Sequence, residues 1–237
     1  KDTDKVNPRS IEKLNDASKK GDSSECMIFL SEGDSAATTI KSACKAYKDP
    51  TLIGSYPLRG KPLNVCGIDT KRLVANQVFS DMMVAVGLKM GEKVENVSQL
   101  RYGKIVLLTD ADFDGFHISG LLLNMFKEYW PELLKLGCVY RFVTPTVKVF
   151  LKKETLMFMT ETGFLNWKKE NDGKVQYTSK YYKGLGSSKT NEFMEYVKNM
   201  DQHLIPIRYE DVKDFDSLDL AFNHARADDR KKWLSIA

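Results

Sequence analysis

Short apolar runs alternate with amphipathic stretches over the first two thirds of the chain. The runs lie at residues 27–30, 52–56, 105–108 and 141–151. Short, nearly continuous apolar runs are typical of strands that are covered on both faces. The stretches between them, residues 35–47, 69–88 and 116–136, are predicted to be helices, and Pro131 is expected to kink the last one or to begin a second helix. This order predicts an α/β fold with a doubly wound, mostly parallel four-stranded sheet.

The same pattern divides the chain into three parts. Residues 1–24 are polar and are interpreted as a linker or arm from a preceding region, so the chain is expected to begin inside a longer protein. Residues 25–151 contain the alternating core. After residue 152 the pattern changes to short strands with a small helix at residues 164–169, and residues 189–237 are predicted to be mainly helical. A mixed α+β extension, residues 152–237, is therefore predicted to follow the core.

Composition narrows the class of protein. Apolar residues make up 42% of the 237 residues, which is ample for a real core. The formal net charge is only +4, which permits nucleic-acid binding without indicating it. The 4 cysteines form no CxxC pair and, with 3 scattered histidines, lack zinc spacing, so they are interpreted as reduced thiols of an intracellular protein. No apolar run approaches the roughly 20 residues of a membrane span, and no membrane association is expected.

Acidic side chains follow two of the predicted strands. Glu32 comes after the first strand, and Asp110, Asp112 and Asp114 come after the third. Ligands of open α/β sheets bind beyond the carboxyl ends of the strands, so these carboxylates are expected to meet in space. A helix-loop-helix calcium site is excluded, because a strand precedes Asp110 and the twelfth loop position, which needs glutamate, is Leu121.

Two interpretations of the aspartates remain. Asp112 or Asp114 can cap the helix expected near Phe116, with Gly115 easing the turn. Helix capping does not account for three alternating aspartates together with Glu32, because clustered carboxylates repel one another unless a cation lies among them. Hard oxygen ligands of this kind favour one or two Mg²⁺ ions, with Mn²⁺ or Ca²⁺ as substitutes. Such ions would act on a phosphodiester.

Basic residues follow the second strand at the same edge of the sheet. Arg59 and Lys61 lie in the loop "PLRGKPLN", which two prolines and a glycine make rigid, and they are predicted to hold a phosphate backbone. The alternative is ordinary solvated surface charge. Ser35 in "EGDSA" is interpreted as a helix cap rather than a nucleophile, because no partnered His-Asp pair is evident.

Several motifs together resemble the TOPRIM region of type II DNA topoisomerases. In chain order they are "LSEGDSA", "YPLRGKPLNV", "RYGKIVLLTDADFDGFHISGLLLNMF", "TPTVKV", "YYKGLGSS" and "ADDRKKWL". "EGDSA" and the alternating aspartates also fit TOPRIM primases and nucleases, whereas "PLRGK", "YYKGLG" and "DDRKKWL" point to the topoisomerases. "YYKGLGSS" is closer to the eukaryotic and viral or phage branch, while "DADFDG" is nearer the gyrase spelling.

The resemblance implies roles for the acidic residues. Glu32, Asp110 and Asp112 match the catalytic metal ligands of the family, and Asp114 would support them. Glu32 and Asp110 would hold the ion at the scissile phosphate. Asp110 and Asp112 would hold a second ion nearby.

The resemblance also implies DNA contacts. Lys61 and Asn64 match family positions that contact DNA, and Arg59 lies in the same loop. Lys183 in "YYKGLG" and His117 are weaker candidates for the same role. His117 has an alternative interpretation as a hydrogen-bonding residue at the start of its helix.

The implied function is a Mg²⁺-dependent DNA cleavage and religation module of a two-fold symmetric, ATP-dependent enzyme. Its partners would be double-stranded DNA, an ATPase region that uses ATP only in the complete enzyme, and a winged-helix domain or subunit that carries the nucleophilic tyrosine. That domain is expected to begin after "DDRKKWL", so the chain is expected to be a fragment or one subunit. The implied location is intracellular and DNA-associated. The alternatives are a TOPRIM nuclease or primase and a noncatalytic DNA- or subunit-docking module.

Overall fold

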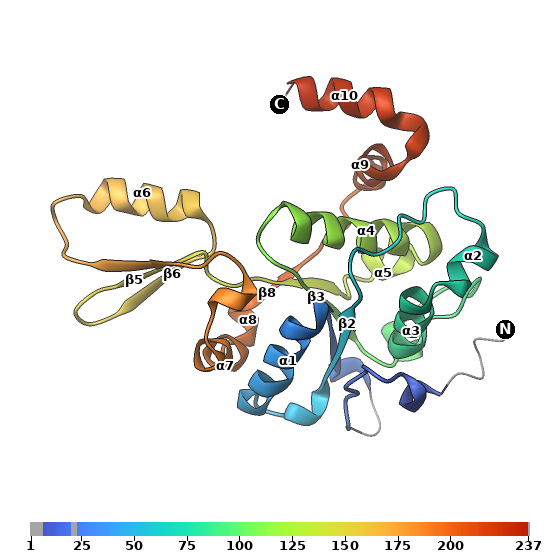
Figure 1. Cartoon of the computed structure of the whole chain (residues 1–237), viewed down its shortest axis with the longest axis horizontal. Helices are drawn as coiled ribbons and strands as arrows, with labels where there is room; N and C mark the ends of the chain where they lie inside the picture. The colour runs from blue at the N-terminus through green and yellow to red at the C-terminus, as the bar shows by residue number, and fades with distance from the viewer. Residues whose placement is uncertain (1–6, 20–22, 237) are drawn as a thin grey trace.

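A sheet of five strands runs through the centre of the molecule, in the order β2-β1-β3-β4-β8 (Figure 1). The computed structural model describes residues 7–19 and 23–236. The parallel strands are β1 (Met27–Glu32), β2 (Ile53–Leu58), β3 (Lys104–Leu108) and β4 (Val139–Phe142). The predicted α/β fold with a mostly parallel sheet is therefore confirmed, and β8 (Leu204–Pro206) is added antiparallel to β4.

Both faces of this sheet are buried, which explains its continuous apolar strands. In β1, Ile28 and Leu30 join one hydrophobic cluster, whereas Met27 and Phe29 join another on the opposite face. Successive side chains of a strand point to opposite faces, so both sets are buried only if both faces are covered. The covering helices are α1 (Gly33–Ala43), α2 (Thr70–Ala75), α3 (Gln77–Val86), α4 (Phe113–Tyr129), α5 (Glu132–Lys135), α7 (Thr190–Lys198) and α8 (Met200–His203).

A second sheet, in the order β6-β5-β7, lies beside the first with α6 packed on it (left in Figure 1). Its elements are β5 (Val147–Phe150), β6 (Thr155–Phe158), α6 (Glu161–Asn171) and β7 (Thr178–Tyr181). The prediction of one strand over residues 141–151 is wrong, because that segment contains the end of β4 and all of β5, in two different sheets. Pro145 lies between them, where it lacks a backbone N–H and restricts the residue before it.

The rest of the extension is mainly helical, as predicted, with α9 (Val212–Phe222) and α10 (Ala227–Ile236) at its end. The exception is β8, a strand of 3 residues that the sequence did not indicate. Pro206 in β8 is compatible with this position because the strand lies at the edge of the sheet. None of the helices in the described ranges has the length and apolar character needed to cross a bilayer.

Two predicted helices are each divided in two. Asn76 separates α2 from α3, and its side chain accepts a hydrogen bond from the backbone N–H of Phe79 to cap the second helix. The other long stretch begins earlier than predicted, at Phe113, and Pro131 precedes α5, as in the second-helix alternative. Short 3₁₀ turns occur at Pro8–Ser10, Ser23–Glu25, Cys44–Ala46, Pro50–Leu52, Val97–Gln99, Leu185–Ser187 and His224–Arg226.

The polar segment of residues 1–24 is described in part, since residues 1–6 and 20–22 lie outside the described residues. Ile11 is buried in one of the main clusters, and the backbone of Asn15 pairs with Ser55 of β2. The described part of this segment therefore packs against the core.

Candidate metal and nucleic-acid site

The carboxyl ends of β1 and β3 bring Glu32 and Asp110 together. Glu32 is the last residue of β1, and Asp110 follows β3 by two positions. The backbone N–H of Asp110 donates to Oε2 of Glu32 at 3.3 Å. These two residues are 78 positions apart in the sequence, and parallel pairing of their strands accounts for their proximity.

The other two aspartates have partners of their own. Asp112 is the N-cap of α4, where its Oδ1 accepts from the backbone N–H of Gly115 at 2.8 Å. Asp114 is exposed and forms an ion pair with Lys61 at 2.6 Å. The hydrogen bond from Lys61 holds the pKa of Asp114 below its usual value. Asp112 thus caps α4, and Asp114 is paired with Lys61 of the same chain.

The electrostatics at Glu32 favour a cation. Burial raises the pKa of this carboxyl, and the charges of Asp110, Asp112 and Asp114 raise it further, against the lowering effect of the hydrogen bond from Asp110. Within residues 7–19 and 23–236, no three His, Cys, Asp or Glu side chains stand close enough to hold a metal by themselves. Glu32 and Asp110 still fit Mg²⁺, which commonly takes one or two carboxylates and completes its shell with water and substrate phosphate.

A turn from the C-terminal extension reaches the same site. The backbone N–H of Leu185 donates to Oδ1 of Asp110 at 2.7 Å, and Gly184 lies against the same carboxylate. Sequence reasoning singled out only Lys183 from this turn. Lys183 is exposed, and its backbone N–H donates to Oγ of Ser187 at 3.0 Å. The glycines of "KGLG" were the available signal, because glycine permits close approach of a backbone to another group.

Arg141 is a second residue that sequence reasoning missed. Its Nη2 donates to the backbone oxygen of Asp110 at 3.4 Å, and its guanidinium lies 4.2 Å from the ring centre of Phe116. Burial lowers the pKa of Arg141, and its buried Nε has no hydrogen-bond partner in the described part of the chain. The signal was a charged residue inside an apolar strand.

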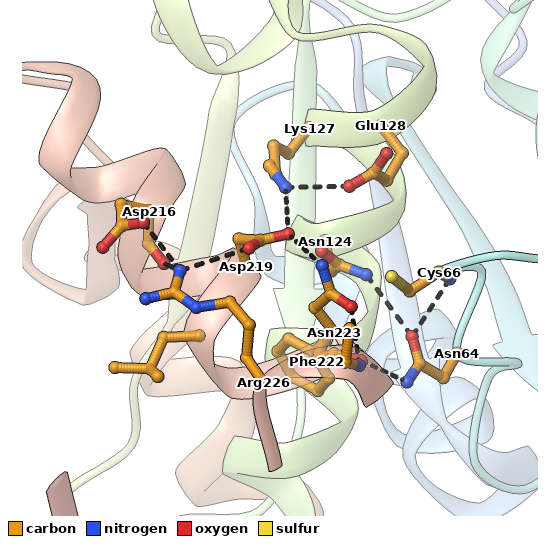
Figure 2. A network of polar contacts seen from close by, with 12 residues as sticks. Asn64, Cys66, Asn124, Lys127, Glu128, Asp216, Asp219, Phe222, Asn223 and Arg226 are labelled. Atoms are coloured by element: carbon orange, nitrogen blue, oxygen red, sulfur yellow. Dashed lines mark hydrogen bonds and ion pairs between the residues drawn. The ribbon is translucent and has the colours of Figure 1, made fainter. Parts of the chain in front are cut away.

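The predicted DNA-contacting residues fall into two groups. Arg59 and Lys61 are exposed at the loop after β2, and Arg59 lies 3.9 Å from Glu12. Asn64 is instead bound within the protein, where its Nδ2 donates to the backbone oxygen of Phe222 at 2.9 Å (Figure 2). The ring of His117 stacks on that of Phe222, with ring centres 6.1 Å apart. The end of α9 therefore lies on both Asn64 and His117.

Ion pairs connect α9 to α4 and to the turn that follows α9. Lys127 of α4 contacts Asp219 at 3.6 Å, and Arg226 contacts both Asp219 and Asp216 (Figure 2). Gly120, also in α4, leaves room for the ring of Phe222, since a Cβ at that position would lie 2.7 Å from its Cζ. This docking places the end of α9 against the loop after β2.

Comparisons with known proteins place the chain among described families and relatives. Residues 27–144 match the family described as Toprim domain, and residues 142–237 match the C-terminal associated domain of TOPRIM. The chain is 39% identical to DNA topoisomerase 2 of Bombyx mori over 232 residues, which is 96% of this chain and 15% of the relative. It is 40% identical to DNA topoisomerase 2-alpha of Rattus norvegicus, with 96% and 15% covered.

A solved structure is similar in fold. It is the crystal structure of the Plasmodium falciparum topoisomerase II DNA-binding, cleavage and re-ligation domain, with a TM-score of 0.88 and 39% sequence identity. The alignment covers 94% of this chain and 31% of that one. The chain thus spans only part of the length of each of these proteins.

Proposed function

The chain belongs to the TOPRIM family and corresponds to the TOPRIM region of eukaryotic-type type II DNA topoisomerases, and on this basis we propose that it is the metal-binding part of a DNA cleavage and religation centre. Its own task would be to hold a divalent cation and DNA phosphates. The nucleophilic tyrosine would come from another domain or subunit. ATP hydrolysis and two-fold assembly would belong to the complete, intracellular and DNA-associated enzyme.

One observation carries this proposal. Glu32 and Asp110 come from two neighbouring parallel strands and meet at the carboxyl edge of the sheet, where open α/β folds bind ligands. Glu32 stands at the N-cap position of α1, but its side chain makes no capping hydrogen bond there and faces three aspartate charges. Glu32 and Asp110 would hold Mg²⁺, with Asp112 and Asp114 nearby.

The site also suits a phosphodiester substrate. Bound Mg²⁺ would offset the negative charge of the phosphate oxygens during in-line displacement. Arg59 and Lys61, exposed on the loop after β2, would attract the DNA backbone, since cations that replace counterions supply much of the affinity for DNA. Lys183, exposed on the turn beside Asp110, would add to this contact.

The proposal is tested by substituting Glu32→Gln and Asp110→Asn, with Asp172→Asn as the control because Asp172 is exposed at the end of α6. Calorimetric titration of the chain with Mg²⁺ should show affinity that both site variants weaken and the control preserves. The complete enzyme carrying either site substitution should fail to relax supercoiled plasmid.

Two outcomes would contradict the proposal. The first is a site variant that folds normally and relaxes plasmid at the wild-type rate. The second is repeated nicking of plasmid by the isolated chain with Mg²⁺, which would indicate a nuclease rather than a module that depends on a tyrosine from elsewhere.

A further inference from the structure

The turn at residues 183–188 touches the carboxylate of Asp110 although it belongs to the C-terminal extension. Resting on the assignment of Asp110 as a metal ligand, we propose that Gly184 and Leu185 are positioning residues, which orient this carboxylate for the cation. The extension would then complete the metal site of the TOPRIM core, in addition to connecting the core to later parts of the enzyme.

Within the described part of the chain, three hydrogen bonds locate Asp110, and one of them acts on its side chain. Its backbone N–H donates to Glu32, and its backbone oxygen accepts from Arg141. Its Oδ1 accepts from the backbone N–H of Leu185 at 2.7 Å, the shortest of the three distances. Hydrogen bonds to an ionised acceptor are among the strong ones, and such partners of metal ligands fix the orientation of the ligand. The bond from Leu185 therefore sets the rotation of the carboxylate.

Gly184 makes this approach possible. Its φ is +127°, a value that L side chains rarely adopt. A Cβ at Gly184 would lie 2.8 Å from Oδ2 and 2.9 Å from Cγ of Asp110. Any other residue would force the turn or the carboxylate of Asp110 to shift. Gly186 is two positions later in the same motif, and a Cβ there would meet nothing within 4 Å. The two glycines thus differ in contact with Asp110 and also in backbone conformation, since Gly184 has a positive φ and Gly186 does not.

The turn is anchored well enough to act as a positioning element. The side chain of Leu185 is buried in the cluster that includes Phe193 of α7 and Val106 of β3. Tyr182 and Lys189 lie on either side of the turn. Glu192 accepts hydrogen bonds from the hydroxyl of Tyr182 and from the backbone N–H of Lys189. The backbone that donates to Asp110 is therefore held by both the core and α7.

The test measures metal binding by the chain itself rather than activity. Mn²⁺ is titrated into wild type, Gly184→Ala and Gly186→Ala, and the concentration of free Mn²⁺ is measured by electron paramagnetic resonance. Gly184→Ala should weaken Mn²⁺ binding about 10- to 100-fold, the usual effect of removing a partner of a metal ligand. Gly186→Ala should bind as wild type does. Thermal unfolding of each variant identifies any general loss of structure.

A second variant removes the hydrogen bond without adding bulk, in case Gly184→Ala does not fold. The amide that precedes Leu185 is replaced by an ester, which deletes the N–H donor and keeps the side chain, and the control carries the ester before Gly186. The Leu185 ester should weaken Mn²⁺ binding and the control ester should not.

The outcomes separate this inference from the proposed function. Wild-type affinity in folded Gly184→Ala, or in the Leu185 ester, would overturn the positioning role and leave the metal site intact. Failure of wild type to bind Mn²⁺, or binding that Asp110→Asn does not change, would overturn both.

Discussion

Glu192 is predicted to contribute strongly to stability by holding the segment around the turn at residues 183–188. Its two carboxylate oxygens accept hydrogen bonds from Lys180, from the hydroxyl of Tyr182 and from the backbone N–H of Lys189. Its side chain is only 16% exposed, so solvent screens these contacts weakly. In Glu192→Gln an amide group replaces one of the two acceptor oxygens, and a donor then faces another donor.

The size of the effect follows from the pKa of Glu192. Burial alone would raise this pKa, but the hydrogen bonds from Tyr182, Lys189 and Lys180 outweigh burial and lower it from 4.5 to about 2. A tenfold change in acidity corresponds to about 1.4 kcal/mol, so the native state favours the ionised carboxylate by about 3 kcal/mol. Glutamine keeps one acceptor, and Glu192→Gln should therefore lower the free energy of unfolding at pH 7 by about 2 kcal/mol.

The sign of the pH dependence is also determined. A carboxyl whose folded pKa is lowered stabilises the protein above its unfolded pKa of 4.5, and this contribution is lost as pH falls toward about 2. The difference in free energy of unfolding between wild type and Glu192→Gln should therefore be about 1.4 kcal/mol smaller at about pH 3.5 than at pH 7.

Urea unfolding followed by circular dichroism at several pH values measures both quantities. Glu170→Gln, an exposed position in α6, is the control and should change stability by less than about 0.5 kcal/mol. The reasoning is refuted if Glu192→Gln differs from wild type by the same amount at every pH, or by no more than the control at pH 7.

Two further predictions concern the core. Gly54→Ala should lower the free energy of unfolding, measured with urea, by about 1 to 3 kcal/mol, because its Cβ would lie 2.4 Å from the hydroxyl oxygen of Tyr102. Stability equal to wild type would show that the Tyr102 ring moves freely. Burial lowers the pKa of His203 from 6.5, so the unfolded chain binds its proton more readily and wild-type stability should fall as pH drops below about 6.5. Thermal unfolding between about pH 7 and 5 measures how stability depends on pH. This dependence should be weaker in His203→Gln than in wild type, and an unchanged dependence would show that other groups cause it.

Some parts of the candidate site were predictable because they depend on strand ends. Glu32 and Asp110 each stand at the end of an apolar run, and parallel strands bring such ends to one edge. No local pattern predicted the contact between Asn64 and Phe222. These residues are 158 positions apart and meet only when α9 packs on α4. The proposed DNA contact of Asn64 stays a prediction, and its side chain is bound to the end of α9 in this structure.

Strands β1, β2 and β3 followed from the local pattern, since burial on both faces of a sheet requires continuous apolar runs. The pattern did not distinguish one long strand from two. In residues 141–151 the chain leaves the first sheet near Pro145 and joins a second one, a choice made by pairing with β6 and β7.

The sequence by itself determined the features that local patterns carry, namely the parallel core, the acidic residues at the strand ends and the family motifs. Only the tertiary structure decided that Leu185 contacts Asp110, that Lys61 pairs with Asp114, and that β8 extends the sheet. The physical reason is the range of the interactions. Strand and helix patterns arise from neighbours in the chain. These contacts join residues 53 to 75 positions apart, and they form only when packed elements meet.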